Sequence, residues 1–275
     1  MTSSSKTKLG VGEAYSLLVG TWIATGLVLA LSIAGLAAPD WTYPEPGLAA
    51  AFRANDAVNL IIVLPVLALA LNRRQWPSGR MLWAAVLLYF CYNSLVPLLS
   101  LPNGIPEAGY LVVFALSGGI AMRLLRTFDH RGLRQSLGGQ VSEPWSGGIL
   151  ALFGLIFAGH AIAILLTDGD MGQAGFGLLV ADFVFGLGWI VAGLALLFRR
   201  HFGYAIGGVG LLQAGLLLAG LLILLVVKPV LDGTPFAFLD LVGILVMSGF
   251  FAVPVVLFMV GVRRTERRQE HASDD

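Results

Sequence analysis

The sequence predicts an all-α membrane protein, a polytopic bundle of about eight transmembrane helices. Hydrophobic residues fill 57% of its 275 positions and charged residues only 12%, about half the charged share of a soluble domain. The mean hydropathy is +0.84. Apolar runs of about 20 residues, the length of helix that crosses roughly 30 Å of hydrocarbon, recur along the whole chain.

Eight such runs follow one another. The first run could instead be a signal peptide, because AGLAAPD resembles a cleavage site, but its apolar stretch is longer than that of an ordinary signal sequence. We therefore expect a retained first span. The predicted spans are roughly 15–37, 56–72, 81–99, 108–125, 147–166, 177–198, 204–227 and 236–262.

The orientation follows from the loops, because cytoplasmic loops of membrane proteins are rich in Lys and Arg. Arginines follow the second, fourth, sixth and eighth spans, and two lysines precede the first. The pattern predicts a multi-pass protein with both termini in the cytoplasm. The other loops are mainly acidic and contain Asp40, Glu45, Glu107, Asp168, Asp170 and Asp232.

Two stretches suggest an internal repeat: NDAVNLIIVLPVLALALNRR and ADFVFGLGWIVAGLALLFRR. In each, an acid (Asp56 or Asp182) lies 17 residues before the first arginine, about 25 Å along a helix. Acids and basic pairs also begin and end unrelated spans, so chance similarity stays open. A duplication predicts two parallel four-helix halves.

The predicted divisions are a cytoplasmic N-terminal segment (1–14), the first half (15–125), a cytoplasmic connection (126–146), the second half (147–262) and a cytoplasmic tail (263–275). We expect the tail and the first dozen residues to be poorly ordered.

Polar side chains within the spans are the candidate site. An ionisable group in hydrocarbon costs several kcal/mol unless it faces a cavity or a partner. The candidates all fall in the outer third to half of the membrane, which predicts an outward-facing polar vestibule that binds a ligand or ion. They are Asp56, Asn59, Asn93, His160, Asp182 and Asp240. Gln213, in the inner half, is expected to hydrogen-bond between helices.

Structural roles for these residues stay open. Asp56 could pair with Arg53 and cap its helix. Asp182 has no cation within one turn, so it needs a partner from another helix or a water-filled cavity. His160 lies at a similar depth and could exchange a proton with Asp182 or satisfy a hydrogen bond. Tyr92 is typical of an interfacial aromatic belt.

The first outer loop, APDWTYPEPGLAAAFRAND, is the longest external segment. Its Trp41 and Tyr43 are typical of aromatic anchors at the membrane interface.

Several chemistries lack their sequence signals. The single Cys91 excludes an internal disulfide and a thiolate zinc site. The chain has no HExxH motif, no closely spaced histidine pair, no GxSxG turn and no phosphate-binding glycine loop. We expect no metal and no cofactor. The net charge of +1 gives no electrostatic reason to expect a nucleic-acid partner.

Two stretches resemble a group of uncharacterised prokaryotic integral membrane proteins: NRRQWPSGRMLWAAVLLYFCYN, and later DFVFGLGWIVAGLALLFRRHFGYAIGGVGLL. The resemblance covers about a third of the chain. It implies eight spans in a prokaryotic inner membrane and implies no activity.

Three functions remain open from the sequence. The first is a small-solute or ion transporter, coupled to protons, in which Asp56 and Asp182 bind the cation or proton. The second is a non-catalytic membrane partner or sensor subunit. The third, an enzyme acting on a lipid or isoprenoid, has no nucleophile or metal set to support it. The expected partners are the lipid bilayer and a small molecule or ion, and homo- and hetero-oligomers both remain open.

Overall fold

The computed structural model describes residues 11–43, 46–101, 104–167, 172–233 and 235–274. Every regular element among these residues is a helix, and eight helices are long and apolar enough to cross a membrane. The predicted all-α bundle of eight spans is therefore confirmed. Most of the predicted segment 1–14 lies outside the described residues, as do the loop charges Lys6, Lys8, Glu45, Asp168 and Asp170.

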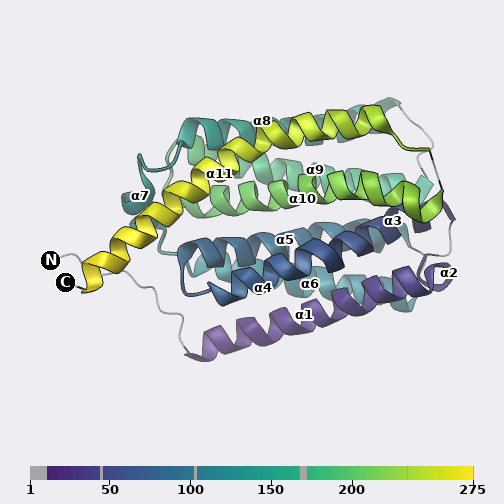
Figure 1. Ribbon diagram of the computed structural model, residues 1–275, viewed down its shortest axis with the longest axis horizontal. Coiled ribbons are helices and arrows are strands. Elements are labelled where there is room, and N and C mark those ends of the chain that lie inside the picture. The colour runs from purple at the N-terminus through teal and green to yellow at the C-terminus, as the bar shows by residue number, and fades with distance from the viewer. Residues whose placement is uncertain (1–10, 44–45, 102–103, 168–171, 234, 275) are drawn as a thin grey trace.

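The spans are α1, the continuous series α3, η1 and α4, and then α5, α6, α8, α9, α10 and α11 (Figure 1). Two short helices, α2 and α7, lie between spans. The bounds are α1 Val11–Ala37, α2 Pro39–Thr42, α3 Pro46–Val58, η1 Asn59–Val63, α4 Leu64–Asn72, α5 Pro77–Ser100, α6 Ile105–Arg126, α7 His130–Leu137, α8 Glu143–Thr167, α9 Gly172–Leu197, α10 Gly203–Asp232 and α11 Phe238–Asp274.

The first four spans lie on one side of the molecule and the last four on the other (Figure 1). Within the first group the spans pack in a closed cycle, first on second, second on third, third on fourth and fourth on first. The last four spans pack in the same cycle. Between the groups, α5 packs on α9 and on α10, and α10 packs on α3. A twofold axis that exchanges the halves would produce this pattern of contacts. The duplication itself stays a prediction.

A π-helical turn, η1, interrupts the second span just before Pro65. The backbone N–H of Leu64 donates to the carbonyl of Asn59, five residues earlier. Proline has no N–H to continue the α-helical pattern, and a π-turn is a common way for a helix to absorb such an interruption. This irregular turn lies directly after Asp56 and includes Asn59.

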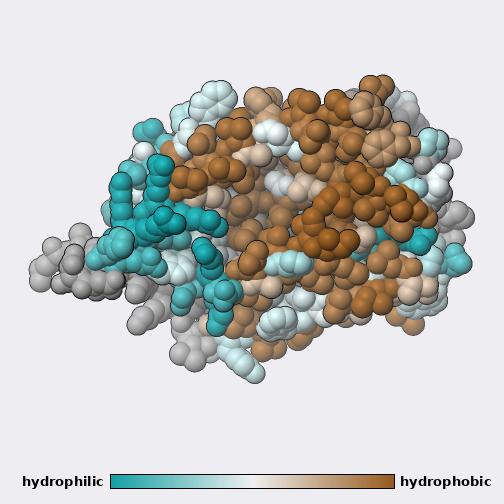
Figure 2. All heavy atoms as spheres, in the orientation of Figure 1, coloured by the Kyte–Doolittle hydropathy of each residue, from teal (hydrophilic) through white to brown (hydrophobic). Residues whose placement is uncertain are grey.

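Hydrophilic residues collect at one end of the molecule, with an apolar belt beside them (Figure 2). We call this the basic end; it holds the arginines that follow α4, α9 and the apolar part of α11. Glu143 is buried there, where it accepts hydrogen bonds from the Gly139 N–H and the Tyr204 hydroxyl and pairs with Arg199 at 3.7 Å. These contacts connect the loop between the two halves to α9 and α10.

The C-terminal tail, expected from the sequence to be poorly ordered, is helical. It continues α11 as a helix to Asp274 and projects beyond the bundle (Figure 1). Glu266 is buried and accepts hydrogen bonds from the Ser78 backbone N–H at 2.7 Å and from the Ser78 hydroxyl at 2.9 Å. A buried, doubly hydrogen-bonded carboxylate fixes the helix against the start of α5, which explains why this polar segment is ordered.

Glycines let α8 and α9 pack backbone against backbone. A Cβ atom at Gly154 would lie 2.5 Å from the Gly186 carbonyl oxygen, and one at Gly186 would lie 2.9 Å from the Gly154 carbonyl oxygen. About two helical turns away, Gly147 and Gly193 meet in the same way. Small residues at membrane helix contacts allow this close approach, so α8 and α9 form a rigid pair.

We predict that Gly154→Ala lowers the unfolding free energy by about 1–3 kcal/mol, because the new methyl group has no space against the α9 backbone. Gly159→Ala is the matched control on α8, since nothing lies within 4 Å of its added Cβ. Thermal unfolding in detergent compares the two. Equal melting temperatures for both variants would contradict the close contact.

Candidate functional site

Two neighbouring cavities lie in the half of the bundle away from the basic end. The larger has a volume of about 390 Å³ and the smaller about 20 Å³. Phe52, Asn55 and Asn93 line both of them. The larger cavity lies between the two groups of spans, and the smaller lies within the first group. The two cavities are therefore adjacent and share one wall.

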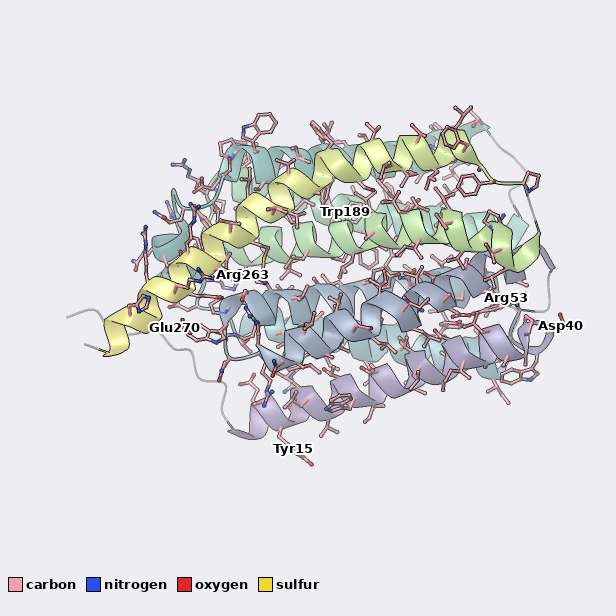
Figure 3. All side chains as sticks on the ribbon, in the orientation of Figure 1. Tyr15, Asp40, Arg53, Trp189, Arg263 and Glu270 are labelled. Carbon is pink, nitrogen blue, oxygen red and sulfur yellow. The ribbon has the colours of Figure 1, made fainter. Side chains whose placement is uncertain are left out.

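The larger cavity is lined by residues of α3, α5, α8, α9 and α10, and most of them are apolar. Trp189, one of the lining residues, lies near the middle of the bundle (Figure 3). The Trp189 indole N–H donates to the Gln213 side-chain oxygen at 2.6 Å, so the interhelical bond expected of Gln213 is confirmed. The other polar lining residues are Asn55, Tyr89, Tyr92 and Asn93.

Asp182 lies behind the wall of the larger cavity. Its side chain is buried, and it accepts a 2.5 Å hydrogen bond from the hydroxyl of Tyr92, which does line the cavity. The Tyr92 ring packs edge-on against Phe185 at 5.3 Å. The acid is therefore one hydroxyl group away from the cavity, and its partner comes from another helix, α5.

Asp56 ends a chain of two buried tyrosines. The Tyr43 hydroxyl donates to Asp56 at 2.7 Å and lies 2.8 Å from the Tyr110 hydroxyl. A tyrosine has one O–H proton, so Tyr110 donates to Tyr43 when Tyr43 donates to Asp56. Burial, together with Tyr110 and Asp56, raises the pKa of Tyr43 well above its usual value. The phenol therefore stays neutral and able to donate.

Two side-chain amides that line the smaller cavity each have one atom without a hydrogen-bond partner. The Asn59 nitrogen donates to the Ser32 hydroxyl at 3.2 Å, whereas its side-chain oxygen is buried with no hydrogen-bond partner. The Asn93 side-chain nitrogen also has none. Such groups are rare in folded proteins and point to a bound species.

The structure brings three of the six predicted site residues together, since Asp56, Asn59 and Asn93 line the smaller cavity. Asp182 lies beside the larger one. His160 is exposed and lines neither of the two cavities.

Asp240 is also exposed, at the start of α11, and it lines neither of the two cavities. Asp56 and Arg53 are both described, and they form no ion pair. Arg53 lies near the end of the bundle that also carries Asp40 (Figure 3).

Two aromatic residues were misassigned from the sequence. Tyr43 and Tyr92 are not interfacial anchors, because both are buried and each donates to an acid. Trp41, in contrast, is exposed, as an anchor would be.

Ser32, Asn55 and Tyr110 also line the smaller cavity and were not predicted from the sequence. Tyr110 reaches Tyr43 across 67 positions, and no local spacing signals such a contact. The predicted vestibule is also less polar than expected, since apolar side chains dominate the lining of the larger cavity.

Among the described residues, no group of three or more His, Cys, Asp or Glu side chains is arranged to hold a metal ion. No protein-family model, curated protein or solved structure matches the chain. The interpretation therefore depends on the geometry of the two cavities.

Gly35 offers a direct test of the Asp56 geometry. A Cβ atom at Gly35 would lie 2.0 Å from an Asp56 carboxylate oxygen and 2.8 Å from the Tyr43 hydroxyl. We predict that Gly35→Ala displaces this pair and lowers the unfolding free energy by about 1–3 kcal/mol.

Gly26→Ala, on the same helix, is the control, because nothing lies within 4 Å of its added Cβ. It should keep or slightly raise stability. Chemical or thermal unfolding measures both variants. If Gly35→Ala is as stable as Gly26→Ala, Asp56 does not pack against α1 as described.

Proposed function

We propose that the protein is a proton-coupled transporter of a small, mostly apolar solute that carries one polar or cationic group. The observation that supports this most strongly is the 390 Å³ cavity with a buried acid directly behind its wall. Its volume lies within the roughly 300–1,000 Å³ typical of small-molecule sites. Apolar residues would bind the body of the solute, and Asn55, Tyr92 and Asn93 would bind its polar group.

The charges around the cavity favour a cationic group. The lining contains no Arg, Lys or His among the described residues, and Asp182 lies directly behind Tyr92. A carboxylate in a region of low dielectric attracts a nearby cation far more strongly than it would in water. An anionic solute would face the opposite effect.

Tyr92 and Asp182 supply a means of proton coupling. When Asp182 is ionised, it accepts the hydrogen bond of the Tyr92 hydroxyl. When a proton binds Asp182, the neutral carboxyl group can donate to the Tyr92 oxygen, and the Tyr92 O–H becomes free to donate to the solute. Proton binding would thus change both the charge and the hydrogen bonding that the solute meets.

Alternating access would come from movement of one half against the other. The larger cavity lies where the two groups of spans meet, which is where carriers built from two halves place their substrates. We propose that the halves rock so that this cavity opens to each side of the membrane in turn.

The membrane, the orientation and the resemblance to a prokaryotic family are part of the same proposal. The alternating distribution of arginines supports an inner membrane location with both termini in the cytoplasm. Reporter fusions at the C-terminus test the orientation: a cytoplasm-active reporter should work there, and a reporter that is active only outside the cytoplasm should not.

Proteoliposomes test the transport. With potassium buffer and valinomycin to hold the membrane potential near zero, a proton gradient should drive uptake of ethidium, a fluorescent apolar cation. We predict that Asp182→Asn abolishes the gradient-driven part, because the side chain can no longer bind and release a proton. Tyr92→Phe should reduce it about tenfold, the effect of losing one hydrogen bond of roughly 1.4 kcal/mol.

Asp240→Asn is the matched control, since Asp240 is an exposed acid away from the cavity. It should transport at the wild-type rate. Gradient-driven uptake that persists in Asp182→Asn would overturn the coupling role of this acid, and wild-type liposomes that match empty ones for ethidium and for neutral apolar dyes would overturn transport.

A further inference from the structure

We propose that the smaller cavity is a binding site for a sodium ion, held by Asp56 and Asn59. This site is separate from the solute cavity and does not depend on transport. Two independent observations support it: a buried carboxylate that lines the smaller cavity, and an unpaired amide oxygen in the lining of the same cavity.

The unpaired oxygen points to a cation. Asn59 is 7% exposed, it lines the cavity, and its side-chain oxygen has no hydrogen-bond partner. Its nitrogen donates to the Ser32 hydroxyl at 3.2 Å, and in this arrangement the oxygen is left free. A buried acceptor left unpaired costs about 1–3 kcal/mol, and a metal ion or a hydrogen-bond donor removes this cost.

Other oxygen atoms surround the same space. Asp56 contributes its carboxylate, and Ser32 also lines the cavity with its hydroxyl group. The Ser94 hydroxyl, another lining group, donates to the Phe90 carbonyl at 2.6 Å, which leaves its lone pairs available. Hard cations prefer such oxygen ligands.

The backbone adds to this set. Pro97 lines the cavity and lies inside α5, where it has no N–H to donate to the carbonyl four residues earlier, that of Asn93. Asn59, which also lines the cavity, begins the π-turn η1, and its own backbone carbonyl accepts from the Leu64 N–H. Broken or irregular helices in membrane carriers commonly use such carbonyls to coordinate Na⁺.

Charge and size select the ion. Among the described residues that line this cavity, Asp56 is the only carboxylate, and one buried negative charge is neutralised by one monovalent ion. The volume of about 20 Å³ is close to the space that a single water molecule needs. A dehydrated sodium ion fits such a space better than the larger potassium ion does.

An ion at this site would act on the solute cavity through their shared wall. Asn55 and Asn93 line both cavities, so an ion that takes either side chain as a further ligand would fix that side chain for both cavities. The bound ion would thereby preorganise the polar end of the larger cavity.

Thermal unfolding of the purified protein tests the proposal. The melting temperature is measured in detergent from 1 to 300 mM NaCl, with choline chloride added to keep the ionic strength constant. A ligand that binds only the folded state should raise the melting temperature by about 3 °C for each tenfold rise above its dissociation constant. KCl should raise it less.

Asp56→Asn should remove this response, and Asp240→Asn should retain it. Because Asp56→Asn could fail to fold, saturable binding of radioactive ²²Na⁺ to the wild type, one ion per chain, is the second measurement. Equal melting temperatures in NaCl and choline chloride, or no saturable ²²Na⁺ binding, would overturn the site. The ethidium assay contains no sodium, so its failure and the failure of this site are distinguishable.

Discussion

The structure depends on one constraint: a carboxylate in hydrocarbon has no water, so the protein must supply its partners. Asp56 and Asp182 both meet this constraint with tyrosines. Tyr43 reaches Asp56 from the loop after α1, and Tyr92 reaches Asp182 from α5. A hydrogen bond to a charged group is stronger than one between neutral groups. These two bonds therefore hold together segments that the apolar surfaces alone would orient only loosely.

The helices pack closely within each group of spans and less closely between the groups, and this difference places the larger cavity between the groups. Gly147, Gly154, Gly186 and Gly193 bring α8 and α9 into backbone contact. Large side chains fill the centre of the first group of spans, where Trp83 is buried and donates its indole N–H to Thr21 at 3.0 Å. Between these two firm regions, where α5 and α10 meet α9 and α3, the side chains do not fill the space. A cavity between rigid units can change shape when the units move.

The sequence predicted the spans because hydrocarbon imposes a length and a composition that the chain must satisfy locally. It predicted the acids as candidates for the same reason. Their partners could not be predicted, since Tyr43 is 13 positions from Asp56 and Tyr92 is 90 positions from Asp182, and helix packing decides which residues meet. The same limit explains His160: its depth was apparent, but the side of the helix on which it lies depends on the neighbouring helices.

The helical tail shows a further limit. A polar segment rich in Arg and Glu has the composition of a disordered end, yet one buried contact from Glu266 to Ser78 orders it. That contact joins residues 188 positions apart. Local composition therefore predicted the hydropathy of the tail and missed its anchoring.

The proposals combine into one account in which an apolar solute occupies the space between the halves, and the acids on either side control its polar end. Native mass spectrometry after mild delipidation tests the occupancy directly. The account predicts one small molecule or lipid retained per chain, lost in Leu221→Trp, which fills the cavity, and kept in Val226→Trp, which faces outward on the same helix. A protein that retains nothing, or two variants that retain the same molecule equally, would contradict it.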